Sequence, residues 1–122
     1  MRIEIRGRNF TVTDELRRQV AEGLGRLDRQ VPLYARCEIV LSEERNPSIE
    51  DRFNAEVTLH LKGATLHAHE ASPDMVHTVS SVLDDIRRQV KKRREKQRKR
   101  SETRRLVNQI QGRFPGGASA RP

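Results

Sequence analysis

The chain has 122 residues, and its 25 Lys and Arg against 17 Asp and Glu give a formal net charge of +8. A chain of this length forms one small domain with extensions, and its few aromatic residues favour a modest core of Ile, Val and Leu over a deep substrate cavity. The single cysteine excludes an internal disulfide and indicates a reduced, cytoplasmic protein. The sequence contains neither an apolar run near the roughly 18 residues of a membrane span nor the apolar stretch of a signal peptide.

The N-terminal part of the chain predicts one strand and one helix. Residues 1–6 alternate between apolar and charged side chains, which is typical of a half-buried strand. Thr13 is expected to cap a helix, which Pro32 prevents from continuing. The apolar stripe of this helix is formed at helical spacing by Leu16, Val20, Leu24 and Leu27. The basic residues that point away from the stripe are Arg18, Arg26 and Arg29.

Three more strands are predicted in the middle of the chain, at residues 37–42, at residues 53–61 and around Leu66 and Ala68. The tight turn before the last of them centres on Lys62-Gly63 or on Gly63-Ala64. Both registers keep the same face buried. Because all four strands have one apolar face, they are expected to form one sheet that is covered on one side only. Cys37 lies on the inward face and is expected to be a buried, inert thiol.

A second helix is predicted from Ser72, with Ser72 as its cap, Pro73 as its first residue and Asp74 in its first turn. Its buried stripe is predicted to contain Met75, Val76, Val79, Val82, Leu83, Ile86 and Val90. The fold class that follows is α+β, in the order β-α-β-β-β-α, with a four-stranded mixed sheet and two helices packed on one face. The first two strands are expected to be parallel through a right-handed crossover, and the remaining pairs antiparallel.

The positive charge is concentrated at the end of this helix. Ten of the fourteen residues from Arg87 to Arg100 are basic and only Glu95 is acidic, so that this segment carries +9 and the rest of the chain about zero. A solvated helix normally intersperses acids that pair with its bases. The positions that would continue the apolar stripe are Arg93, Arg94 and Arg100. No core accepts these three side chains, so the helix is expected to extend beyond the domain as a basic rod that binds a polyanion.

The side chains indicate which polyanion. The basic rod offers Lys and Arg with Gln89 and Gln97, which suits phosphate contacts more than base readout. Bulky apolar residues, which a membrane-surface helix requires, are absent from residues 91–100. The outer sheet face is expected to show Thr and His without Phe or Tyr, so base stacking on the sheet is not expected. Folded RNA, recognised by its shape and phosphates, fits best.

Neither catalysis nor a cofactor is predicted. Three histidines, His60, His67 and His69, share the outer sheet face, with His60 opposite His67 in one of the two turn registers. A zinc site would need further ligands, but no Cys joins them and Glu70 has the opposite parity. The sequence contains no evident nucleophile–base pair, glycine-rich phosphate loop or carboxylate pair. The expectation is a protein that is not an enzyme, with no metal, no cofactor and no small-molecule substrate.

The pattern over about residues 1–100 resembles the ribosome hibernation-promoting factor family, which includes the ribosome-associated inhibitor proteins and was once labelled sigma-54 modulation proteins. The resemblance rests on the order of the elements and on residues 7–13, 37–42, 63–68 and 74–75, the last leading into 87–92. It implies a factor that occupies the mRNA and tRNA channel of the small ribosomal subunit, blocks tRNA binding at the A and P sites, and inhibits translation in stationary phase or stress.

The resemblance also implies which side chains contact RNA. Together with the basic pattern, it predicts the rRNA-binding residues Arg26, Arg29, Arg87, Arg88, Lys91, Lys92, Arg94, Lys96 and Lys99. Two positions depart from the family pattern, since Val76 stands where Tyr is frequent and Gly23 where some members have a base. The expected organisation is a ribosome-binding domain at 1–100 and a partly disordered tail at 101–122, with a helical turn or two within 104–110. By this resemblance the chain looks like a short form that lacks the second domain through which long members pair ribosomes, and it is expected to be a monomer off the ribosome.

Two alternatives remain open from the sequence. A generic double-stranded RNA-binding domain also places its helices on one face of a sheet. Its basic cluster usually lies at the start of the last helix, however, and residues 73–86 here contain no Lys or Arg. The basic rod could instead bind an acidic protein such as a sigma factor. Whether bound ribosomes are single or paired is also left open.

Overall fold

The computed structural model describes the backbone of residues 1–113 and the side chains of residues 1–110. The chain divides into two units, Met1–Val90 and a second that begins at Lys91. Residues 114–122, the last part of the predicted tail 101–122, lie outside the described part.

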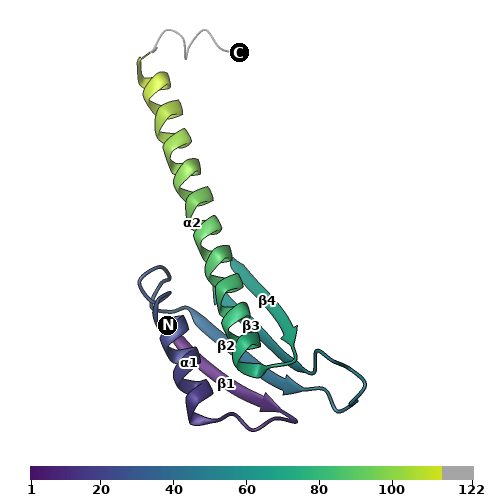
Figure 1. The fold of residues 1–122 in the computed structure, drawn as a ribbon. Helices are drawn as coiled ribbons and strands as arrows, with labels where there is room; N and C mark the ends of the chain where they lie inside the picture. The colour runs from purple at the N-terminus through teal and green to yellow at the C-terminus, as the bar shows by residue number, and fades with distance from the viewer. Residues whose placement is uncertain (114–122) are drawn as a thin grey trace. The chain divides into compact units, whose positions relative to one another are not determined.

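The first unit is built on a four-stranded sheet (Figure 1). The strands are β1 (Arg2–Arg8), β2 (Arg36–Glu43), β3 (Phe53–Leu61) and β4 (Ala64–Ser72), and the helices are α1 (Asp14–Gly25) and α2 (Met75–Arg113). The sheet order is β1-β2-β3-β4, with β1 and β2 parallel and the other two pairs antiparallel. Figure 1 shows α1 and the beginning of α2 side by side on one face of this sheet. The predicted α+β fold is confirmed.

The core lies between the two helices and the inner sheet face. Alternate residues of β2 and β3 are fully buried, as the period of two in a strand requires. The predicted stripes of both helices are buried too, with one exception. Val76 is 54% exposed, so its placement in the stripe was wrong. It lies in the first turn of α2, where its carbonyl accepts a hydrogen bond from Gln19 Nε2 of α1 at 2.9 Å.

Helix α1 begins as predicted but ends earlier. The Thr13 hydroxyl accepts a hydrogen bond from the backbone N–H of Leu16 at 3.2 Å, which is an N-cap. The helix ends at Gly25 and is followed by turns, in which Leu27 N donates to the carbonyl of Leu24 at 2.9 Å. Leu27 is still 1% exposed, so the chain leaves the helix without giving up its contact with the core.

Helix α2 begins two residues later than expected. Asp74, rather than Ser72, is the cap, since its Oδ2 accepts a hydrogen bond from His77 N at 3.1 Å. The Ser72 hydroxyl instead bonds to the buried Thr78 hydroxyl at 2.5 Å and accepts from Asp74 N at 3.2 Å. The helix thus begins at Met75 and not at Pro73.

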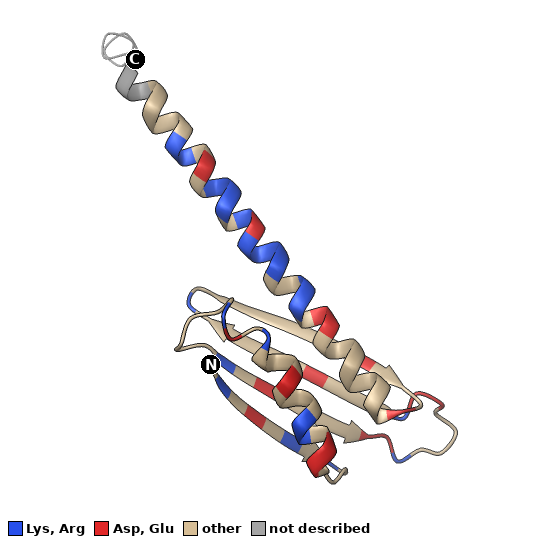
Figure 2. Ribbon diagram, turned by 60° about the vertical axis from the view of Figure 1, so that its left-hand side comes forward, with Lys and Arg blue, Asp and Glu red and all other residues tan. Residues whose placement is uncertain are grey.

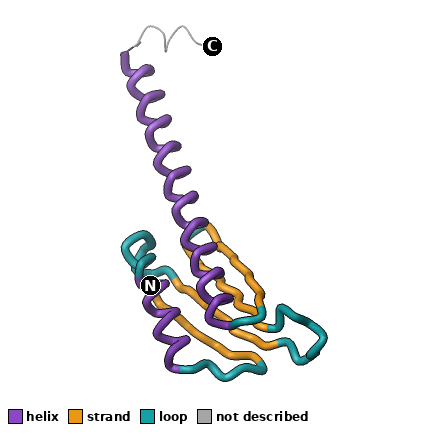
Figure 3. The backbone as a smooth tube through the Cα atoms, viewed as in Figure 1, coloured by secondary structure: helices purple, strands orange, loops and turns teal. Residues whose placement is uncertain are grey.

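The turn between β3 and β4 settles the register that the sequence left open. Leu61 pairs with Ala64, so Lys62 and Gly63 are the two loop residues. Gly63 has φ of 78°, a conformation that favours glycine. The loops that join the elements are drawn in Figure 3, where the longest lies between α1 and β2. In this register His67 lies opposite Thr58, not opposite His60.

Helix α2 also extends further than the sequence suggested. It has 39 residues and runs through Ser101, where a tail was expected to begin, to Arg113. At about 1.5 Å per residue, such a helix is about 58 Å long. Residues 104–110, for which a turn or two was expected, are part of this helix. Among residues 1–113, no helix is both long and apolar enough to cross a membrane.

Candidate nucleic-acid interface

The basic segment, residues 87–100, lies entirely within α2. Figure 2 shows Lys and Arg gathered along the part of α2 that leads to the C-terminus, with few Asp or Glu among them, whereas the strands and α1 carry both signs of charge. From Lys91 to Arg100 every side chain is exposed except that of Arg93, which is half-buried. Arg94 and Arg100, which continue the apolar stripe of the helix, are therefore exposed to solvent.

The charge of the basic segment is left largely uncompensated by the protein. Among residues 1–110, Arg87 is the one member of the segment in an ion pair, with the Asp84 carboxylate one turn earlier. Glu95, the acid within the segment, forms no ion pair among these residues. Like charges at this spacing repel one another, and an external polyanion would relieve that repulsion.

Arg87 differs from the other predicted RNA-binding residues. Its side chain is 26% exposed and is tied to Asp84, and its Nη1 donates to the carbonyl of Gly23 in α1 at 3.5 Å. This places Arg87 between the two helices of the first unit. Arg88, the next residue, is exposed and has no ion pair among residues 1–110. The Gln89 side chain also contacts the sheet of the first unit, since its Nε2 donates to the carbonyl of His67 on β4.

The two basic residues predicted on the first helix lie just beyond it. Arg26 is the C-cap of α1, and Arg29 belongs to the turns that follow. Both side chains are exposed. Both side chains can therefore contact an anion, although their backbone belongs to the turns after α1 and not to the helix.

Gly23 has a packing role that the sequence did not reveal. It is a buried residue of α1, and a Cβ built on it would lie 2.5 Å from Cδ1 of Leu83 on α2. From the sequence alone, Gly23 stands out only as a position where some family members have a base. In this chain it is a close contact between the two helices.

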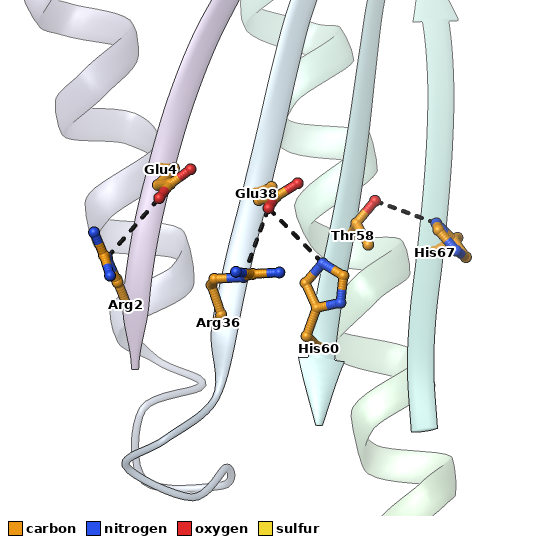
Figure 4. Close-up of polar contacts among 7 residues, drawn as sticks. All are labelled: Arg2, Glu4, Arg36, Glu38, Thr58, His60 and His67. Atoms are coloured by element: carbon orange, nitrogen blue, oxygen red, sulfur yellow. Dashed lines mark hydrogen bonds and ion pairs between the residues drawn. The ribbon is translucent and has the colours of Figure 1, made fainter. Parts of the chain in front are cut away.

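The open sheet face carries polar and charged side chains in rows across the strands (Figure 4). Arg36 Nε lies 3.6 Å from Glu38 Oε1, and His60 Nε2 lies 3.9 Å from the same oxygen. His67 Nδ1 lies 3.2 Å from the Thr58 hydroxyl. The histidines are thus divided among separate polar contacts, and residues 1–110 contain no group of three side chains able to hold a metal ion.

Cys37 is fully buried on the inner face of β2, as its parity predicted. Burial raises the pKa of its thiol to about 12, and the neighbouring Glu38 carboxylate adds to the increase. The thiol therefore stays protonated at neutral pH, which is the unreactive form.

Tyr34 is an exposed aromatic residue that the strand pattern did not single out. It precedes β2, in the turn after Pro32, and 63% of its surface is exposed. Together with Arg36, His60, Leu61 and Lys62 it lines an open cavity of about 560 Å³. The register that brings these strand and turn residues together cannot be read from local sequence.

These features define the class of protein: a small α+β domain with a long, exposed cationic helix. The sequence matches the family described as sigma 54 modulation protein / S30EA ribosomal protein over residues 3–98. The chain belongs to this family.

Relatives from several bacteria match the same region. The chain is 31% identical to a ribosome hibernation promotion factor of Picosynechococcus, over 79% of this chain and 50% of the relative. It is 30% identical to a ribosome hibernation promoting factor of Azotobacter vinelandii, over 84% of this chain and 91% of the relative. The chain thus spans about half the length of some relatives and most of another.

Solved structures agree with the fold. The N-terminal domain of Thermus thermophilus Protein Y has a TM-score of 0.64 and 29% identity, covering 75% of this chain and 98% of that one. A ribosomal subunit interface protein from Coxiella burnetii has a TM-score of 0.66 and 19% identity, covering 78% of this chain and 99% of that one. The second likeness supports the fold alone.

Proposed function

We propose that this protein is a ribosome hibernation factor, which binds small-subunit rRNA in the mRNA and tRNA channel and inhibits translation in stationary phase or stress. The observation that carries the proposal is the basic segment, which has ten basic residues against one acid and is exposed from Lys91 to Arg100 except at the half-buried Arg93. Membership of the family and the names of the relatives supply the partner. The protein acts in the cytoplasm as a binding factor and not as an enzyme.

The chemistry of the segment suits rRNA phosphates. Lys and Arg donate charge-assisted hydrogen bonds to phosphate oxygens, and a helix fixes their spacing. Phosphate contacts position a protein on RNA without reading its sequence. A folded RNA channel then supplies specificity through its shape. Binding there would exclude mRNA and tRNA by occupying their space, with no catalytic step.

The proposed contact residues are the exposed bases Arg26, Arg29, Arg88, Lys91, Lys92, Arg94, Lys96 and Lys99, with Arg87 in a mixed role. Arg87 is held by Asp84 and by the Gly23 carbonyl, so that we expect it to stabilise the helix pair first and to contact RNA second. Arg88 and Lys92 lie one turn apart on the helix, where neither competes with a partner among residues 1–110.

Reversing two charges tests this interface. The double variant Arg88→Glu with Lys92→Glu is expected to abolish cosedimentation with small ribosomal subunits, because it removes two phosphate contacts and adds repulsion. Its far-UV circular dichroism and unfolding midpoint should stay near those of the wild type, since both side chains are exposed. The matched control is Arg6→Glu with Arg8→Glu, which changes the net charge equally on exposed positions of β1.

Retained cosedimentation of the Arg88 and Lys92 variant would contradict the proposed interface. Loss of binding in the β1 control as well would mean that net charge alone, and not the helix, governs binding. Pull-down from lysate with and without ribonuclease separates an RNA partner from an acidic protein. Survival of the captured material after ribonuclease treatment would favour the protein partner.

A further inference from the structure

The turn from Pro32 to Ala35 exposes two large side chains at the edge of the first unit. Ala35 N donates to the carbonyl of Pro32 at 3.0 Å, which closes the turn. Its two central residues, Leu33 and Tyr34, are 89% and 63% exposed, whereas Ala35 is fully buried. Ala35 is also held by Arg2 N, which donates to its carbonyl at 2.9 Å. A fixed turn thus presents an aromatic ring to solvent.

Cationic side chains lie next to this ring. Arg36 follows Tyr34 by two residues at the start of β2 and is paired in register with His60 of β3. Lys62 is in the turn that follows β3. With Tyr34 and Leu61, these side chains line the open cavity of about 560 Å³, a volume within the range of about 300–1,000 Å³ for small-molecule sites.

The charge of this cavity is positive even after its acidic neighbour is counted. Glu38 Oε1 lies 3.6 Å from Arg36 Nε and 3.9 Å from His60 Nε2, and Figure 4 marks both contacts. Its contact is with Nε of Arg36, and the two terminal nitrogens of that guanidinium have no ion pair among residues 1–110. Lys62 is exposed and likewise forms no ion pair among them. Glu38 therefore orients Arg36 without neutralising the site.

We propose that this cavity binds one unpaired nucleotide of an RNA, with the base stacked on the Tyr34 ring and the phosphate held by Arg36 and Lys62. Aromatic rings bind bases of any sequence through their π-faces, and adjacent cations hold the backbone. The inference deepens the proposed RNA-binding function and rests on it. It adds a stacking contact on the first unit, whereas the basic segment offers phosphate contacts only.

Tyr34 can be observed without ambiguity by NMR, because it is the only tyrosine of the chain. The full chain is titrated with hexa-adenylate, with AMP and with ribose 5-phosphate, and the Tyr34 ring protons are followed by NMR. Hexa-adenylate and AMP are expected to shift these resonances upfield through the ring current of adenine. Ribose 5-phosphate, which has no base, is expected to leave them in place.

Variants separate stacking from charge. The Tyr34→Ala variant lacks the tyrosine ring, so its AMP titration is followed at the His60 ring protons. The AMP concentration at half-saturation should rise by about 5-fold to 150-fold. Arg36→Gln with Lys62→Gln, read at Tyr34, should raise it about 5-fold, as the loss of two exposed ion pairs implies. The matched control, Arg6→Gln with Arg8→Gln at the far end of β1, should leave it unchanged.

Several results would overturn this inference. A Tyr34 ring unmoved by saturating hexa-adenylate would exclude stacking and favour a protein contact at Leu33 and Tyr34. A shift with AMP but not with hexa-adenylate would assign the site to free nucleotides. An equal shift with ribose 5-phosphate would make it a phosphate site only. None of these results bears on ribosome cosedimentation. Failure of the wild-type protein to cosediment with ribosomes would instead contradict the proposed function.

Discussion

Gly7 shows how a single residue shapes the chain entry to α1. A Cβ at this position would lie 2.1 Å from the carbonyl oxygen of Phe10, which is backbone and cannot move aside cheaply. Two residues later Asn9 has φ of 54°, a left-handed conformation that Asn tolerates better than most residues. The tight bend after β1 therefore depends on a missing side chain followed by a tolerant one.

Gly7→Ala is expected to lower the free energy of unfolding by about 1–3 kcal/mol, since the added methyl group overlaps backbone. Urea denaturation followed by circular dichroism measures the change as a lower midpoint at constant slope. The control is Gly25→Ala, where nothing lies within 4 Å of an added Cβ. It should be neutral or stabilising by up to about 1 kcal/mol. Equal midpoints for the two variants would contradict this account of Gly7.

Single residues also mark the limits of pattern reasoning. The alternation in β2 and β3 was enough to predict Cys37 as buried, because a strand of period two leaves no other choice. Val76 was misplaced because it lies at the edge of the predicted stripe, and helical spacing alone does not fix how wide the buried face of a helix is. Tyr34 was missed because its cationic neighbours come from β2 and from the turn after β3, and only the strand register brings them together.

At the scale of the element, the start of α2 depends on which side chain caps it. Ser72 fits the sequence rule for a cap, yet its hydroxyl is engaged by Thr78 at 2.5 Å. Asp74 then takes the capping role and accepts from His77 N. Local propensity identified the region where the helix begins, but it did not distinguish Ser72 from Asp74 as the capping residue.

Asp74→Ala should therefore destabilise the fold by about 0.5–2 kcal/mol, the usual cost of losing an N-cap. Asp74→Asn should retain most of the stability, because its amide oxygen can accept the same hydrogen bond from His77 N. Thermal and urea unfolding of the three proteins compare them directly. A wild-type midpoint in the Ala variant would show that Ser72 is able to serve as the cap.

The C-terminal part of α2 continues beyond the point that the sequence suggested. Residues 101–110 are helical and exposed, although Ser101 was expected to begin a tail. The prediction ended the rod where the run of basic residues ends, but Arg, Gln, Glu and Leu in residues 101–110 are themselves good helix formers. Intrinsic propensity is thus sufficient to extend the helix where packing provides no guide.

At the scale of the whole molecule, the net charge of +8 is effectively the charge of the basic segment. The first unit presents mixed charges on its open face, where Arg36 and His60 share Glu38. Concentrating positive charge on one helix favours an extended anion and steers its approach. The fold itself was predictable from element order and alternation, whereas the proposed partner, ribosomal RNA, was inferred from the family resemblance.

The salt dependence of binding to small ribosomal subunits tests the central claim most directly. If about six phosphates are neutralised, log K should fall with log[salt] at a slope of about −4 to −5. Replacing Arg88 and Lys92 by Gln should make this slope shallower by about 1.4–1.8, because two contacts are lost. The measurement is a titration in KCl at constant Mg²⁺, with the wild type and the double variant side by side. A slope near zero, or the same slope for both proteins, would contradict binding through the phosphates at this helix.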